Sequence, residues 1–423
     1  MPVVSGGSFR HHNIPMATAF EFRLLATDGA ARRGEMSTPH GVVQTPAFMP
    51  VGTQGAVKGM TERDLRENGA QIILANTYHL YLRPGDRLIA RRGGLHRFIG
   101  WDGPILTDSG GFQAFSLGPR EPGRGSRVGV PQPARRRIAE DGICFRSHLD
   151  GSEHLLTPEL ATDTQARLGS DIAMALDECL GHPATADQAR QSMERTLRWG
   201  RRSRDRLLWL RSQPPDAVLE DGLTPIRTNP GQAQFGIVQG SVYPDLREES
   251  ARETQTIGFD AYAIGGLSVG EPIDAMYDTV AATAPLLPAD RPRYLMGTGT
   301  PLDLVECVAR GIDVFDCVMP TRHARNGQLF TGHGPLNIKN ARYGEDDRPV
   351  EETCRCYTCR HYSRAYLRHL FLVKEIAACT LNTLHNLHFY LDTLARIRDA
   401  IAFNSFESLR RTFHQRYSLR SLS

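Results

Sequence analysis

The sequence contains no long hydrophobic run. Its 423 residues include no window of roughly 18 uncharged apolar residues, the length that a membrane-spanning helix needs, so we expect no membrane association. The first 16 residues hold glycine, histidine and proline but lack an apolar core. This composition excludes a secretory signal and predicts a disordered tail over residues 1–16 of a cytoplasmic protein.

The net charge of the chain is also small. With 50 Lys and Arg against 47 Asp and Glu, the formal charge of +3 does not by itself indicate a polyanionic partner. The arginines are nevertheless unevenly placed, in clusters at Arg135–Arg137, Arg201–Arg206 and Arg322–Arg325. We interpret the second cluster as the solvated face of a helix.

Cysteine is sparse except at one place. Of eight cysteines, Cys354, Cys356 and Cys359 lie within six residues, and the others are scattered among apolar neighbours. This distribution excludes a disulfide framework and favours a reducing compartment with one metal site. With His385, the three thiolates make the ligand set of one closed, structural Zn²⁺ per chain. Free surface thiols or a redox pair are the alternatives, and the fourth ligand stays open because four more candidates lie nearby: His361, His369, Cys379 and His388.

Short apolar runs alternate with amphipathic segments along the chain. Eight such strand–helix units predict an α/β fold, a (β/α)₈ TIM barrel over residues 17–340, with a doubly wound open sheet as the alternative. We expect a zinc-binding subdomain over residues 341–395, and a C-terminal helix and tail over 396–423 that packs on the barrel. The predicted strands are Val42–Met49, Gln71–Ala75, Pro104–Thr107, Asp171–Leu176, Gln234–Val238, Ala261–Ile264, Arg293–Met296 and Val314–Val318.

Two insertions interrupt the repeat. Residues 118–137 are rich in proline, glycine and arginine and follow the third strand, which predicts a mobile loop beside the site. Residues 212–233 follow a long helix, which places them at the opposite rim. Between the two insertions, Phe145–Leu155 predicts a hairpin with an Asp-Gly turn.

Polar residues and glycines follow the strands at the end where barrel enzymes build their sites. Asp108 and Asp316 end the third and eighth strands, and two carboxylates facing each other across a barrel mouth suit glycosidic chemistry. A loop cap is the alternative reading of Asp316. Asp177, Gln239 and the Gly266-Leu267 backbone are suited to reading a flat heterocycle, and Phe112 to stacking on it.

Phosphate contacts are predicted beside the same mouth. Gly297-Thr298-Gly299-Thr300-Pro301 opens a helix after the seventh strand, the usual phosphate position in barrels. Arg322 and Arg325 follow Asp316 and are suited to further phosphates or a base edge. Together these features predict an N-glycosidic reaction on a nucleic acid.

Several long motifs resemble those of bacterial tRNA-guanine transglycosylases, over about Phe20 to Phe406. They are Thr107–Gln113, Asp177-Glu178-Cys179, Phe235–Ser241, Ile264–Glu271, Tyr294–Gly297 and Phe315–Arg322, together with the zinc ligands.

The resemblance implies exchange of guanine at the wobble position of G-U-N anticodons for 7-aminomethyl-7-deazaguanine, a step of queuosine synthesis, by a homodimer. It implies Asp316 as nucleophile of a covalent ribosyl intermediate and Asp108 as general acid/base. The implied substrate-binding residues are Asp108, Ser109, Gly110, Gly111, Phe112, Asp177, Gln239, Gly266, Leu267 and Met296. The implied RNA-binding residues are Gly297, Thr298, Gly299, Thr300, Pro301, Leu302, Asp303, Thr321, Arg322, His323, Ala324 and Arg325.

The chain also departs from the family pattern. Ser268 replaces a commoner alanine, and His323 stands where small or amide residues are usual. Val269 and Cys179 favour the smaller aminomethyl base over queuine. A non-catalytic tRNA-binding partner subunit is the alternative function, although it would be expected to lose the three acids; a sugar glycosidase fits the zinc and phosphate motifs less well.

Overall fold

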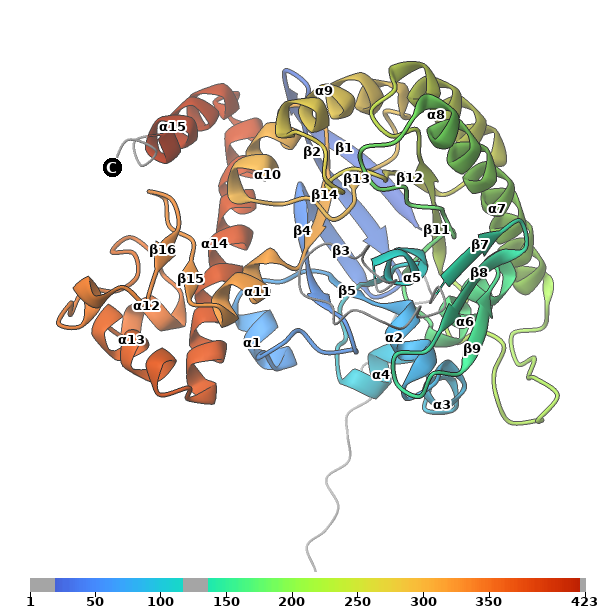
Figure 1. Ribbon diagram of the computed structural model, residues 1–423, viewed down its shortest axis with the longest axis horizontal. Helices are drawn as coiled ribbons and strands as arrows, with labels where there is room; N and C mark the ends of the chain where they lie inside the picture. The colour runs from blue at the N-terminus through green and yellow to red at the C-terminus, as the bar shows by residue number, and fades with distance from the viewer. Residues whose placement is uncertain (1–19, 117–135, 419–423) are drawn as a thin grey trace, which may run out of the picture.

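The computed structural model describes residues 20–116 and 136–418. Within them, eight parallel strands close into a barrel in the spatial order β10-β11-β12-β13-β14-β4-β5-β6 (Figure 1). This closure confirms the TIM barrel and excludes the open sheet. The strands are β4 (Ala47–Gly52), β5 (Ile73–Ala75), β6 (Ile105–Thr107), β10 (Ile172–Met174), β11 (Ala233–Val238), β12 (Ala261–Ile264), β13 (Arg293–Leu295) and β14 (Val314–Cys317).

The first predicted strand, Val42–Met49, is wrong as a single element. Its first part belongs to β3 (Gly41–Thr45), which pairs antiparallel with β2 (Ala31–Thr38), and only its end lies in β4. Pro46 separates the two strands because proline has no N–H for a sheet ladder. Barrel pairing starts at the next residue, where the Ala47 N–H donates to the carbonyl of Asp313 at 2.9 Å.

A small antiparallel sheet closes the N-terminal end of the barrel. It consists of β1 (Glu21–Asp28), β2 and β3, and its side chains Phe22, Met36 and Val43 belong to one buried cluster with the barrel interior. Residues such as Met49 and Phe235 fill that interior. The barrel is therefore a packed core whose opposite, C-terminal end is available for a site.

Helices surround the barrel. α7 (Ala186–Ser212) is the long helix expected before residues 212–233, and a capping box between Thr185 and Gln188 satisfies its first N–H groups. The other helices before β14 are α1 (Glu62–Glu67), α2 (Thr77–Leu82), α3 (Asp86–Arg91), α4 (Leu95–Ile99), α5 (Gly111–Ser116), α6 (Pro158–Leu168), α8 (Pro244–Ile257), α9 (Ile273–Thr283), the 3₁₀ turn η1 (Ala284–Leu286) and α10 (Pro301–Val308).

The Arg201–Arg206 cluster lies on α7 and is largely paired. Arg202 donates to both oxygens of Glu159 at 2.7 Å, and Arg206 donates to both oxygens of Asp163 at 2.7 and 2.9 Å. Both acids lie on α6, so these arginines join neighbouring helices and are not left for a polyanion.

The second predicted insertion, residues 212–233, is described in full, whereas the first is described only at its end. Most of the predicted 118–137 loop lies outside the described residues, and its last residues begin β7 (Arg136–Ala139). β7 pairs with β8 (Gly142–Arg146), which pairs with β9 (Glu153–Leu156), so the Asp-Gly hairpin is confirmed. The segment between α7 and β11 enters β11 at its N-terminal end, the rim opposite the site, as expected.

The chain between β14 and α14 (Ile376–Ala402) forms a small region beside the barrel, at the left of Figure 1. It contains α11 (Met319–Arg325), β15 (Gln328–Leu329), β16 (Leu336–Asn337), η2 (Ala341–Tyr343), α12 (Tyr357–His361) and α13 (Arg364–Leu372). No helix in the described part of the chain is both long and apolar enough to cross a membrane.

α14 packs against two hydrophobic cores, that of the small region and that of the barrel. Leu381 and Leu384 of its first half are buried with the small region, whereas Tyr390 and Leu394 of its second half are buried with the barrel. Residue 395, predicted as a domain boundary, falls inside this helix. α15 (Phe406–Ser418) follows and rests on α10, where Arg410 and His414 both bind Glu306 at 2.6 Å.

Candidate active site and metal site

Asp108 follows β6 and is held by the start of α2. Its Oδ1 accepts the Thr77 N–H at 2.9 Å, and its Oδ2 accepts the side-chain amide of Asn76. The pKa of Asp108 is raised to about 7, chiefly by burial and also by the nearby charge of Asp316, against the lowering effect of the Thr77 N–H. A carboxyl with this pKa can both donate and accept a proton near neutral pH.

Asp316 lies on β14 and points to the same place. Its Oδ1 accepts two hydrogen bonds, from the Tyr294 hydroxyl at 2.6 Å and from the Gly297 N–H at 2.7 Å. Among the described residues no group donates to Oδ2. Burial raises the pKa of Asp316, opposed by these two donors. Asp316 thus does cap the Gly297 loop, but through Oδ1 only.

The third acid, Asp177, pairs with an amide. Its Oδ2 accepts a hydrogen bond from Gln239 Nε2 at 2.8 Å, and burial raises its pKa to about 6. A β-carbon at Gly266 would come within 2.2 Å of Gln239 Oε1, so glycine is needed there for the amide to lie beside the backbone. Asp177, Gln239 and Gly266 therefore form one polar wall, as the sequence indicated.

The Ser109–Phe112 turn lies beside this wall. A β-carbon at Gly111 would lie 3.0 Å from the carbonyl oxygen of Asp177, and Gly110 has a φ of +83°. The turn therefore requires both glycines. Phe112 is 47% exposed. Leu267 is buried, and Met296 is half-buried at the end of β13.

Glu271 holds the loop after β12 and was not singled out from the sequence. One of its oxygens accepts the Val269 N–H at 2.9 Å, and the other accepts the Ser268 N–H. Ser268 has a φ of +58°, and its hydroxyl lies 2.9 Å from that of Thr298. A carboxylate two or three residues after a glycine-rich turn is the signal that could have identified it.

Several polar groups of the predicted phosphate loop, Gly297–Pro301, are already hydrogen-bonded within the protein. Thr300 and Asp303 form a capping box at the start of α10, and the second oxygen of Asp303 accepts the Tyr277 hydroxyl at 2.7 Å. The Gly299 carbonyl accepts the Tyr390 hydroxyl at 2.7 Å. Thr298 and Pro301 are buried and Leu302 is half-buried, so Gly297 is the exposed member of this predicted set.

The predicted RNA-binding residues on α11 also differ in exposure. Thr321 and Ala324 are buried, and the Ala324 carbonyl accepts the Asn382 amide of α14 at 3.3 Å. His323 hydrogen-bonds to Gln328 and stacks on Phe330. Arg325 is half-buried, whereas Arg322 is exposed. The structure therefore presents Arg322 of this set most openly to a polyanion.

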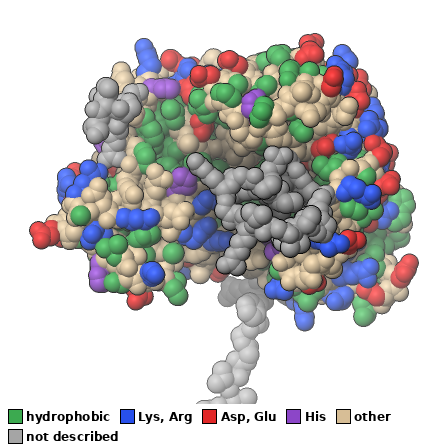
Figure 2. Space-filling model, viewed as in Figure 1, with side chains coloured by type: hydrophobic (Ala, Val, Ile, Leu, Met, Phe, Trp, Pro, Cys, Tyr) green, Lys and Arg blue, Asp and Glu red, His purple; other side chains and the backbone are tan. Residues whose placement is uncertain are grey.

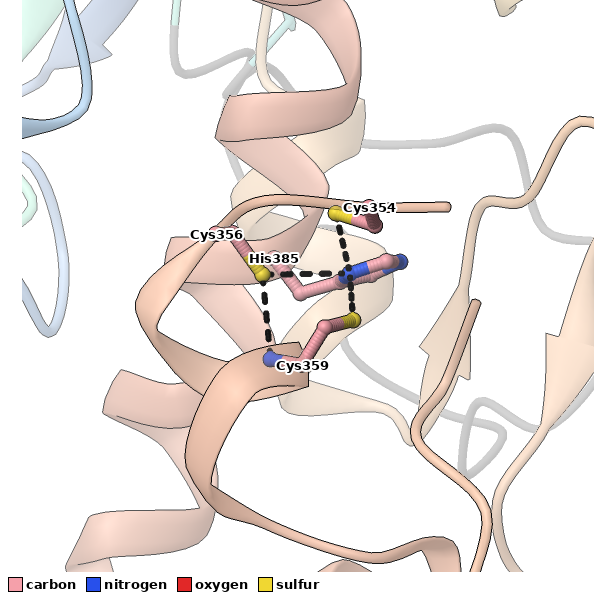
Figure 3. Close-up of side chains that lie close together, drawn as sticks. All are labelled: Cys354, Cys356, Cys359 and His385. Carbon is pink, nitrogen blue, oxygen red and sulfur yellow. Dashed lines mark hydrogen bonds between the residues drawn. The ribbon is translucent and has the colours of Figure 1, made fainter. Parts of the chain in front are cut away.

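Cys354, Cys356, Cys359 and His385 converge on one point (Figure 3), and their ligand atoms all lie within 4.8 Å of one another. The three sulfurs lie 3.8, 3.6 and 3.3 Å from His385 Nδ1. These distances match the edge of about 3.6 Å expected for a tetrahedron of thiolates and imidazole around Zn²⁺. The structure thus selects His385 over His361, His369, Cys379 and His388 among the described residues.

His385 and its neighbour are fixed from behind. Nε2 of His385 lies 2.7 Å from the Phe330 carbonyl, which orients Nδ1 toward the thiolates. The adjacent Asn386 donates to the carbonyls of Pro320 and Gln328, both at 3.0 Å. Pro320 lies on α11, the helix that follows β14, so Asn386 links the helix that carries His385 to the segment just after Asp316.

Comparison with known proteins gives a consistent result. The family model described as Queuine tRNA-ribosyltransferase matches residues 28–419. Proteins named Queuine tRNA-ribosyltransferase from Aromatoleum aromaticum and Syntrophobacter fumaroxidans are 54% and 52% identical, over 92% and 93% of this chain and 96% and 97% of their own. One from Thermoanaerobacter pseudethanolicus is 49% identical, over 94% of this chain and 98% of its own.

Proposed function

The chain belongs to the Queuine tRNA-ribosyltransferase family and is a tRNA-guanine pentosyltransferase of queuosine synthesis; we propose that it exchanges guanine at the wobble position of G-U-N anticodons for 7-aminomethyl-7-deazaguanine. The observation that carries the proposal is the pair Asp108 and Asp316. One carboxyl has a pKa near neutrality, and the other has one oxygen without a donor among the described residues.

The proposed reaction is a double displacement. Oδ2 of Asp316 attacks the ribose C1′, the bond from C1′ to guanine N9 breaks, and the protonated Asp108 supplies a proton to the departing base. Asp108, now a carboxylate, then takes the N9 proton of the incoming base, which attacks C1′ and displaces Asp316. Asp177, Gln239 and Gly266 hold each base in turn, with Phe112 and Met296 on its faces.

RNA binding requires that the target base leaves its stack and that the backbone phosphates are held. Figure 2 shows Lys and Arg side chains on the face of the small region beside the barrel. Exposed Arg322, Lys339, Arg355 and Arg360 lie on this region. They support the proposal that it carries part of the tRNA contact.

We also propose that the Cys354–His385 cluster binds one structural Zn²⁺ and that the enzyme is a homodimer in the cytoplasm. All four ligands come from the protein, so the metal stabilises the fold and leaves no position for water. For the dimer, the support is an aromatic surface on α12 and α13: Tyr357 and Tyr366 are exposed, and Tyr362 stacks on Tyr366.

The experiment is incorporation of labelled guanine into unmodified tRNA with a G-U-N anticodon, with the same tRNA carrying adenine at the wobble position as control. We expect incorporation in the first tRNA alone, and competition by 7-aminomethyl-7-deazaguanine. A folded, metal-loaded protein that incorporates no guanine would refute the proposal.

A further inference from the structure

Tyr294 connects two neighbouring strands beneath the barrel mouth. It lies on β13, where it is aligned with Val314 of β14, two residues before Asp316. Side chains two residues apart on a strand share a face, so the ring of Tyr294 lies beside Asp316 within the barrel. The ring is buried, and its hydroxyl donates to Oδ1 of Asp316 at 2.6 Å.

A second donor acts on the same oxygen. The Gly297 N–H reaches Oδ1 at 2.7 Å, from the loop that follows the strand of Tyr294. One strand and its loop therefore supply both donors, and both are directed at Oδ1. Burial raises the pKa of Tyr294 well above its usual value, so its hydroxyl keeps the proton that it donates across the working pH range.

We propose that Tyr294 is a positioning residue that, together with the Gly297 N–H, fixes Oδ1 of Asp316, so that Oδ2 attacks the ribose and the carboxylate is a stabilised leaving group in the second displacement. The inference rests on the proposed function and specifies which oxygen reacts. In the covalent intermediate Oδ2 is bonded to C1′, and Oδ1 becomes the carbonyl oxygen of an ester.

The two displacements depend on Tyr294 to different extents. An ester carbonyl accepts a hydrogen bond less strongly than a carboxylate does, because the negative charge has gone. The Tyr294 bond therefore weakens when the ester forms and strengthens when the incoming base expels Asp316. Loss of the hydroxyl destabilises the free carboxylate relative to the ester, which slows the second displacement and shifts the internal equilibrium toward the intermediate.

The test is Tyr294→Phe, which removes the hydroxyl and keeps the buried ring. Tyr262→Phe is the matched control. Tyr262 is a buried tyrosine on the adjacent strand β12, and it packs in the cluster that includes residues of the surrounding helices, whereas Tyr294 packs in the barrel interior. Thermal unfolding of both variants establishes that the fold is intact. The measurements are kcat and KM for tRNA, and the fraction of enzyme linked to RNA on a denaturing gel at pH 8.

We expect kcat of Tyr294→Phe to fall on the order of 10-fold or more and KM for tRNA to fall in parallel, so that kcat/KM changes by less than about 3-fold, with a linked fraction above that of wild type. Tyr262→Phe should match wild type in all three. A wild-type kcat in Tyr294→Phe, or a linked fraction that falls in step with kcat, would overturn the inference while leaving the proposed function intact. Absence of exchange and of linked RNA in wild type would instead remove the proposed function and this inference with it.

Discussion

Asp108 and Asp316 are electrostatically coupled. Burial is the main reason that the pKa of Asp108 is raised to about 7, and the charge of Asp316 adds to it. Two carboxyl groups so placed do not both ionise easily, so an ionised Asp316 favours the protonated form of Asp108. This division of roles is what a nucleophile and a general acid need.

Replacing Asp316, the proposed nucleophile, should abolish the proposed covalent intermediate. Asp316→Asn keeps the shape of the side chain but has no anionic oxygen to attack C1′. We expect no covalent RNA on a denaturing gel and loss of exchange by at least about 1000-fold, as for removal of other covalent nucleophiles. An adduct at the wild-type level would place the nucleophile elsewhere.

The pH dependence of adduct formation should follow Asp108. A carboxyl is protonated below its pKa, and the first displacement uses the protonated form, so its rate should fall as pH rises above about 7. In single-turnover experiments between pH 6 and 9 we expect a loss approaching 10-fold per pH unit at the alkaline end. Asp108→Asn should be slow and free of this alkaline limb; a limb that persisted would assign the proton to another group.

Removing one metal ligand should lower metal content and stability together. Cys356→Ala takes one thiolate from the cluster, and binding of a structural metal is coupled to folding. We expect less than one Zn²⁺ per chain by elemental analysis and a lower melting temperature. Cys379→Ala, outside the cluster, is the control; full zinc content in Cys356→Ala would contradict the ligand assignment.

Glu271 should matter more than Ser268 for holding the base. Glu271→Ala leaves the Ser268 and Val269 N–H groups without their acceptor, whereas Ser268→Ala removes one contact with Thr298. We expect KM for guanine to rise about 10-fold or more in Glu271→Ala and to change much less in Ser268→Ala, which loses one hydrogen bond. Equal KM values in the two variants would count against this role of Glu271.

The far end of the barrel should contribute a pH-dependent term to stability. Burial alone would raise the pKa of Asp171, but hydrogen bonds from His40 and His96, at 2.7 and 3.0 Å, lower it to about 2. A carboxyl whose folded pKa is depressed stabilises the fold above its unfolded pKa and loses that contribution as pH falls through the folded value. Asp171→Asn should therefore lower the free energy of unfolding at pH 7 by roughly 2 kcal/mol, and the difference should shrink between pH 4 and 2 in urea titrations. A constant difference would contradict it.

The sequence was sufficient for the elements whose signals are local. The capping box at Thr185 fixes the start of α7, and the spacing of Cys354, Cys356 and Cys359 predicts a metal site. Proline at position 46 was the missed local signal that divides the first predicted strand. Strand-end polarity also indicated Asp108, Asp177 and Asp316, because parallel strands end at one rim.

The features that the sequence does not predict depend on contacts between segments that are distant in the chain. Whether Thr300 and Asp303 cap their own helix or leave its N–H groups to a phosphate is decided by side-chain direction, and both are already paired. Ala324 lies two residues after the exposed Arg322 in the sequence, but α14 covers it. The two donors on Oδ1 of Asp316 likewise come from another strand and its loop.

α14 packs against both the barrel and the small region, and this has a consequence for the cell. His385 places this helix against the metal cluster, and the neighbouring Asn386 holds the carbonyls of Pro320 and Gln328, just beyond the strand of Asp316. A shortage of the proposed Zn²⁺ should therefore disturb Asp316, the proposed nucleophile, in molecules whose barrel is still folded. The queuosine content of tRNA would then report on the supply of a metal to which the proposed mechanism assigns no chemical step.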